Sequence, residues 1–176
     1  MLAHEGTLVP RPDTAEPDII DAVQKCADEL YAKGETDGAP WTEALLRTLR
    51  ELGKKRKFYV CHQGFKAWIW DLCWIVGDER PGQGDFNGVA LACEIEWDQA
   101  KGGSGRLEDF LKLTVCQDGH RLFVFNSGAT RKTMNKRLDE LVEASKWSTG
   151  KRYLVIALPP AKSRQSLKPT YLIWRT

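Results

Sequence analysis

The stretch VALACEIEW, residues 89–97, decides the fold of this chain. It is rich in apolar and β-branched residues, which predicts a largely buried β-strand. The preceding apolar segment, WIWDLCWIV at residues 68–76, is separated from it by a turn-rich loop at residues 77–88. The two segments therefore predict an antiparallel hairpin.

Apolar periodicity places helices and further strands on both sides of this hairpin. The predicted helices run from Pro17 to Gly34, Trp41 to Leu52, Leu107 to Val115 and Thr130 to Trp147. The predicted strands are Phe58 to Phe65, Ala67 to Val76, Val89 to Trp97, Leu122 to Phe125, Tyr153 to Leu158 and Tyr171 to Trp174. This order predicts an α/β fold with a mixed central β-sheet flanked by helices. We expect residues 1–16 to form a flexible N-terminal arm and residues 17–176 a single domain.

Composition narrows the class of protein. The chain has 176 residues, 42% of them hydrophobic, which is typical of a folded domain. Its five cysteines form an odd set without a Cys-x-x-Cys pair, which argues against a disulfide framework and a zinc cage. No apolar run approaches the roughly 20 residues of a membrane helix, so we expect a cytoplasmic protein without a membrane partner. The net charge of +2 does not by itself indicate a polyanion partner.

Three acids interrupt the central hairpin. Glu94 and Glu96 alternate with apolar residues, so both carboxylates lie on one face of their strand, roughly 7 Å apart. If Val76 pairs with Val89, Asp71 lies opposite Glu94. Three converging carboxylates would require a cation or a proton, and all-oxygen ligands favour Mg²⁺ or Mn²⁺. The alternative is that Asp71 ends its strand and both glutamates form the solvent face of an edge strand.

With this pattern the sequence resembles the PD-(D/E)XK superfamily, the restriction-endonuclease-like nucleases. The resemblance is carried by Trp70-Asp71-Leu72, by the segment ACEIEW at residues 92–97 and by the helix LEDFLKL at residues 107–113. It spans roughly residues 41–126 and implies a restriction-endonuclease-like core that runs helix, three strands, helix, strand. The usual lysine of the second motif is replaced here by Glu96.

The resemblance implies metal-dependent hydrolysis of phosphodiester bonds in nucleic acid, with DNA favoured. By position, Asp71 and Glu94 would hold Mg²⁺, and Glu96 would orient or deprotonate the attacking water. Lys112 would replace the missing lysine, and we expect it to point toward Glu96. The competing interpretation of Lys112 is an exposed i, i+4 pair with Glu108. Glu43 matches an optional helical acid of the family, although its position also suits a surface residue.

Basic residues could supply the surface that binds nucleic acid. The candidates are Lys54, Lys55, Arg56, Lys57, Arg131 and Lys132. They could equally be ordinary surface charge. Two alternatives to a nuclease stay open, namely a catalytically inactive nuclease-like domain that binds nucleic acid or aids assembly, and a weaker one, an enzyme acting on small phosphate compounds. A homodimer also stays open.

Overall fold

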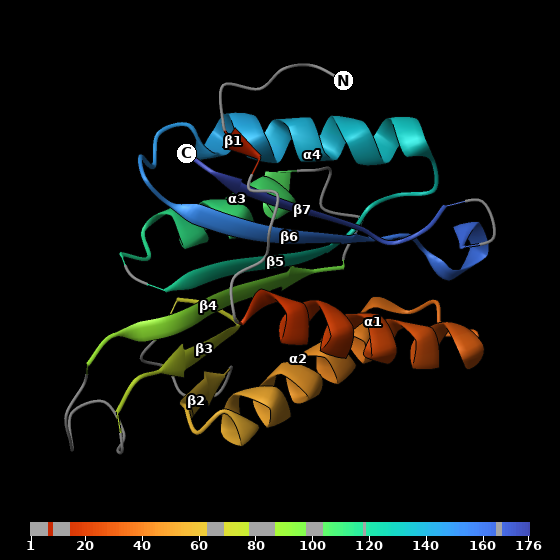
Figure 1. The fold of residues 1–176 in the computed structure, drawn as a ribbon. Helices are drawn as coiled ribbons and strands as arrows, with labels where there is room; N and C mark the ends of the chain where they lie inside the picture. Colours follow the sequence, from red (N-terminus) through yellow and green to blue (C-terminus); the bar gives the residue numbers. More distant parts are fainter. Residues whose placement is uncertain are drawn as a thin grey trace.

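A seven-stranded mixed β-sheet with helices on both faces makes up the described part of the chain (Figure 1). The computed structural model describes residues 7–8, 15–62, 69–77, 87–97, 104–117, 119–164 and 167–176. The helices are α1 Glu16–Ala32, α2 Gly38–Lys55, α3 Ser104–Thr114 and α4 Arg131–Ser145. The strands are β1 Thr7–Leu8, β2 Tyr59–His62, β3 Leu72–Ile75, β4 Val89–Glu96, β5 His120–Asn126, β6 Arg152–Leu158 and β7 Thr170–Arg175. The predicted α/β class is confirmed.

The strands follow the order β1-β7-β6-β5-β4-β3-β2 across the sheet. Strands β4, β5 and β6 are parallel, and the other neighbours are antiparallel. Parallel neighbours need a crossover connection, which α3 supplies between β4 and β5 and α4 between β5 and β6. These two helices pack on one face of the sheet, whereas α1 and α2 cover the other (Figure 1). The predicted order of helices and strands after the N-terminal segment is also observed.

The sequence pattern predicts helix α2 correctly but does not predict where the helix ends. Trp41 and Leu49 are fully buried, as the apolar stripe predicts. The sequence predicts an end at Gly53, yet the helix continues to Lys55. A Cβ at Gly53 would collide with the indole of Trp74. Gly53 therefore lets the Trp74 ring pack closely against the helix and does not terminate it.

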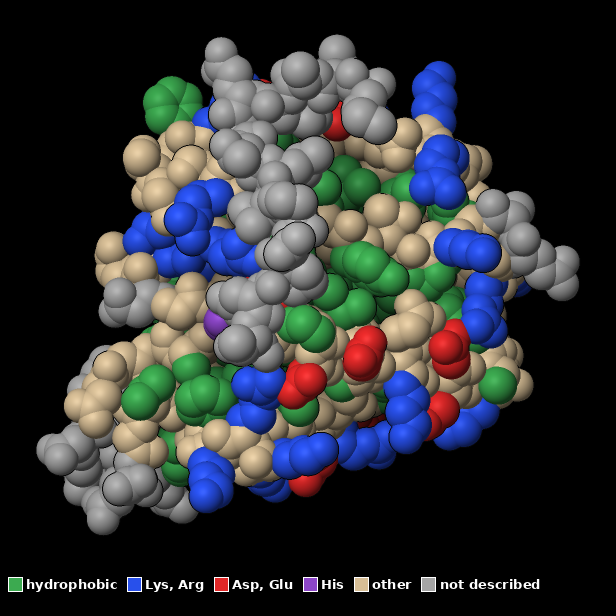
Figure 2. All heavy atoms as spheres, viewed as in Figure 1, with side chains coloured by type: hydrophobic (Ala, Val, Ile, Leu, Met, Phe, Trp, Pro, Cys, Tyr) green, Lys and Arg blue, Asp and Glu red, His purple; other side chains and the backbone are tan. Residues whose placement is uncertain are grey.

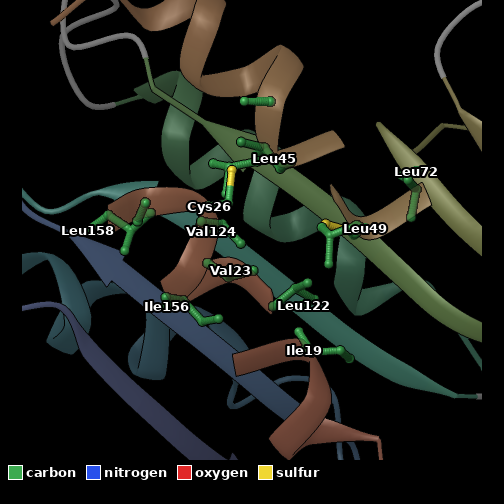
Figure 3. Close-up of a cluster of buried hydrophobic side chains, with 14 of the residues drawn as sticks. Ile19, Val23, Cys26, Leu45, Leu49, Leu72, Leu122, Val124, Ile156 and Leu158 are labelled. Carbon is green, nitrogen blue, oxygen red and sulfur yellow. The ribbon is translucent and has the colours of Figure 1, made fainter. Parts of the chain in front are cut away.

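The largest buried cluster lies between α1, α2 and the sheet (Figure 3). Ile19 and Val23 of α1 and Leu45 of α2 are fully buried there, together with Ile156 of β6. Burial of such a side chain contributes about 1.5–3 kcal/mol. The cluster also contains Cys93 of β4. Because side chains alternate along a strand, the glutamates of β4 point toward α3 and α4.

The N-terminal segment departs from its prediction. Residues Thr7–Leu8 pair with β7 as a short antiparallel edge strand. Glu16, assigned to the flexible arm, instead begins α1 and is fully buried. Its two carboxylate oxygens accept hydrogen bonds from Nε and Nη2 of Arg152 at 2.7 and 2.6 Å. This ion pair joins α1 to β6 and compensates the charge that Glu16 buries.

Strand β3 begins later than the sequence predicts. The sequence predicts that this strand starts at Ala67, whereas β3 starts at Leu72. The predicted end of the preceding strand at Phe65 lies outside the described residues. Residues 63–68 lie outside the described residues. Trp70 and Asp71 immediately precede β3 and form a bend. Asp71 therefore stands at the end of the strand, as the alternative interpretation held, and it also faces β4.

Candidate active site

Strands β3 and β4 bring Asp71 and Glu94 together at one end of their hairpin. The register pairs Leu72 with Cys93, which places Asp71 opposite Glu94, as predicted. The starting assumption was wrong in detail, because a bulge between Trp74 and Ile75 shifts the pairs nearer the turn by one residue. Oδ2 of Asp71 accepts a hydrogen bond from the backbone N–H of Ile95 at 2.9 Å. This bond holds the Asp71 carboxylate against β4.

Glu94 is an acidic residue in the buried strand β4. Its exposed fraction is 1%, and it lies beside Phe123 of β5. Burial is the main reason that its pKa is raised to about 8, and the negative charges of Asp71 and Asp109 add to the effect. Within the described residues, Oε1 of Glu94 has no hydrogen-bond partner. The strand thus buries a carboxyl group with one oxygen that has no hydrogen-bond partner among the described residues.

Lys112 of helix α3 is the cation of this site. Its Nζ lies 3.3 Å from Oε2 of Glu94 and 2.6 Å from Oδ1 of Asp109. Desolvation lowers the pKa of Lys112, but its interactions with Asp109 and Glu94 outweigh this effect and leave the pKa raised. The sequence predicts that Lys112 points toward Glu96, but its observed ion-pair partners are Glu94, two residues earlier, and Asp109. The competing pair with Glu108 does not form, and the i, i+3 partner is Asp109.

Helix α3 is oriented by its own apolar residues. Phe110 and Leu113 are fully buried in the cluster between the sheet and helices α3 and α4. With that side against the sheet, the adjacent polar residues Asp109 and Lys112 reach the edge of the carboxylate pair. Nε1 of Trp70 donates to the backbone oxygen of Lys112 at 2.9 Å and ties the helix to the residue before Asp71. Sequence reasoning missed Asp109, although its i, i+3 spacing to Lys112 was a usable signal.

The other two predicted acids, Glu96 and Glu43, do not join Asp71 and Glu94. Glu96 is 7% exposed and lies on the same side of β4 as Glu94. However, no three His, Cys, Asp or Glu side chains in the described ranges are grouped closely enough to hold a metal ion. Glu96 therefore does not complete a three-carboxylate cluster with Asp71 and Glu94. Glu43 is exposed on α2, which packs against the opposite face of the sheet, so it is not brought to the pair.

The basic residues predicted to bind nucleic acid do not form one surface. Lys54, Lys55, Arg56 and Lys57 end α2 and its following turn, whereas Arg131 and Lys132 begin α4. Figure 1 places these two helix ends at opposite corners of the molecule. Two of the side chains also bind acids, since Lys54 Nζ lies 3.1 Å from Glu51 Oε1 and Arg56 Nη2 lies 2.5 Å from Asp18 Oδ2. The predicted single groove is therefore not built from this set.

No similarity to a known protein assigns a role to this site, so only its chemistry indicates what it does. Among the described helices, none combines the length and apolar character that crossing a membrane requires. Comparison with known protein families, curated proteins and solved structures gave no match for this chain.

Proposed function

We propose that the protein is a metal-dependent phosphodiesterase that hydrolyses nucleic acid, with DNA favoured over RNA. The observation that supports this most directly is the buried carboxyl of Glu94, with an unpartnered oxygen and a pKa of about 8. A structural carboxyl at this depth would be expected to satisfy both oxygens. A site that pairs such a group with Asp71 is arranged for a ligand that carries positive charge.

The donor set suits a hard divalent ion. Asp71 and Glu94 offer oxygen atoms, and Mg²⁺ is commonly held by one or two carboxylates, with water and substrate phosphate completing its shell. Mg²⁺ or Mn²⁺ held there would polarise a phosphoryl oxygen and make water more acidic. The resemblance to PD-(D/E)XK nucleases implies the same assignment.

The remaining residues have defined tasks in this proposal. The Lys112 ammonium lies beside Glu94 and would stabilise negative charge that develops on the scissile phosphate. Asp109 is a positioning residue, because its 2.6 Å contact holds the ammonium group at the site. Only the resemblance gives Glu96 the task of orienting the attacking water or accepting its proton, because Glu96 does not complete a cluster with Asp71 and Glu94. The N–H of Ile95 donates to the Asp71 carboxylate and would keep it oriented toward a bound ion.

The test combines metal binding with cleavage. Calorimetric titration with Mn²⁺ should show binding by the wild-type protein and weak or no binding by Glu94→Gln. The same variant should lose cleavage of single-stranded DNA, double-stranded DNA or RNA, whichever the wild type cuts. Glu108→Gln removes an exposed carboxyl from the same helix and serves as the matched control, with both properties retained.

The alternative function is a nuclease-like domain that binds nucleic acid without cutting it. The direct pairing of Lys112 with Glu94 favours this reading, because the two charges partly satisfy each other without a metal ion. Binding of DNA or RNA with no cleavage in either Mg²⁺ or Mn²⁺ would select this alternative. Absence of any Mn²⁺ binding by the folded wild-type protein would refute the proposed metal site.

A further inference from the structure

A second polar site lies at the end of the sheet where the interior strands β5 and β6 begin. It is a cavity of about 430 Å³, and its lining includes Arg121, Lys151, Arg152, Arg175 and His120. Figure 2 shows Lys and Arg side chains gathered at the left of the view, where Figure 1 shows these strands starting. The carboxylate pair lies farther along the parallel strands, since His120 is level with Leu91 and not with Glu94. The basic cavity is therefore separate from the candidate active site.

Among the described residues, the positive charge of this cavity is only partly compensated. Arg152 is neutralised by Glu16 through two hydrogen bonds. Lys151 Nζ donates to the backbone and side-chain oxygens of Gln117, which are neutral acceptors. Arg175 is exposed, and its side chain has no ion-pair or hydrogen-bond partner within the described residues. Neutral acceptors position these cations without cancelling their charge, so the cavity attracts anions.

Arg121 forms the inner wall of the cavity. It is 3% exposed, and its guanidinium donates to backbone oxygens in the segment between α3 and β5, including those of Gly119 and Gln117 at 3.1 Å. Its Nε, however, is buried with no hydrogen-bond partner in the described part of the chain. Every one of its bonded acceptors is neutral, so a full positive charge remains behind the more exposed Lys151 and Arg175. A buried cation with two more exposed cations in front of it suits the binding of a phosphate group.

An exposed aromatic residue lies close to the cavity in sequence. Trp147 is 93% exposed, whereas Trp41, Trp74 and Trp174 are at most 1% exposed. It precedes Thr149 and Gly150, which line the cavity, by only two and three residues. Indole rings that face solvent next to basic residues provide stacking platforms for unpaired bases. Trp147 and the cavity cation Lys151 thus lie on one continuous segment of the chain.

We propose that this cavity binds the backbone phosphate of a single-stranded nucleic acid, while Trp147 stacks on a neighbouring unpaired base. The inference goes beyond the proposed hydrolysis and does not require it, because binding here involves no metal ion. The cavity does not include Lys54 to Lys57, Arg131 or Lys132, which lie at the end of α2 and the start of α4. A paired duplex would not offer a base to Trp147, so the site should prefer a single strand.

The test measures binding of a fluorescent oligothymidylate by anisotropy in EDTA, so that cleavage cannot interfere. The double variant Lys151→Gln/Arg175→Gln should weaken binding at least about tenfold. It should also reduce the slope of log affinity against log salt by about 1.4, because each phosphate contact on a single strand contributes about 0.7. Lys25→Gln/Lys168→Gln removes the same charge from exposed positions away from the cavity and should leave both quantities unchanged.

Trp147→Ala provides an independent variant, because its exposed side chain can be removed with little effect on folding. It should weaken binding of the single strand about tenfold and abolish quenching of the protein's tryptophan fluorescence by the strand. Equal salt slopes for the cavity variant and its charge-matched control would overturn the proposal. Equal affinity for the duplex, or equally tight binding of inorganic phosphate alone, would also overturn it. Failure of metal binding or cleavage would leave these results unaffected, so the two proposals fail separately.

Discussion

Glu94→Gln is expected to change how the stability of the protein depends on pH when no divalent ion is present. The pKa of Glu94 is raised from 4.5 to about 8, mainly by burial and then by Asp71. Between these pH values the folded protein keeps a proton that the unfolded chain releases. Stability is therefore highest below the lower value, falls as the pH rises through this window, and levels off above it. At about 1.4 kcal/mol for each pH unit, the full loss in the wild type approaches about 5 kcal/mol.

Glutamine does not titrate, so the variant lacks this loss. Urea unfolding in EDTA should show the stability of Glu94→Gln improving relative to the wild type by several kcal/mol between about pH 5 and about pH 9. Adding Mg²⁺ at the higher pH should stabilise the wild type and narrow the gap, because the ion binds the ionised carboxylate. Glu108→Gln, on the exposed side of α3, should give a nearly constant difference from the wild type. A constant difference for Glu94→Gln as well would show that Glu94 ionises normally, which would refute the reasoning behind the cation site.

Three further changes test other parts of the structure. Lys112→Met removes the group that lowers the pKa of Glu94, so the midpoint of the stability profile should move to higher pH, as followed by urea unfolding. Trp41→Ala deletes a fully buried ring that stacks on a second indole at 4.1 Å, and calorimetric or urea unfolding should show a loss of about 3–5 kcal/mol. Gly119→Ala should cost more than Gly150→Ala in the same assay: both glycines have positive φ, of 75° and 74°, but only at the former would a Cβ collide with the backbone of β4. Similar losses at the two glycines would contradict the close approach at Gly119.

Local sequence patterns correctly predicted most of the helices and strands and the pairing of Asp71 with Glu94. Alternation along a strand assigns Glu94 to a face regardless of what covers it, and hairpin pairing then selects the partner. The same reasoning missed the bulge near Trp74, because a one-residue shift next to a turn leaves the apolar pattern almost unchanged. It also misread Gly53, whose role depends on a ring from a distant strand.

The sequence by itself determined the α/β class, the order of elements and the strand face that carries the acids, since these depend on periodicities within single segments. Only the tertiary structure decided which charges meet. Lys112 contacts Glu94 because Phe110 and Leu113 set the rotation of α3 on the sheet, and Glu16 meets Arg152 across 136 residues of chain. The basic cavity likewise joins the starts of β5 and β6 to the end of β7. Such contacts depend on packing between segments remote in sequence, and neither charge nor spacing along the chain encodes them directly.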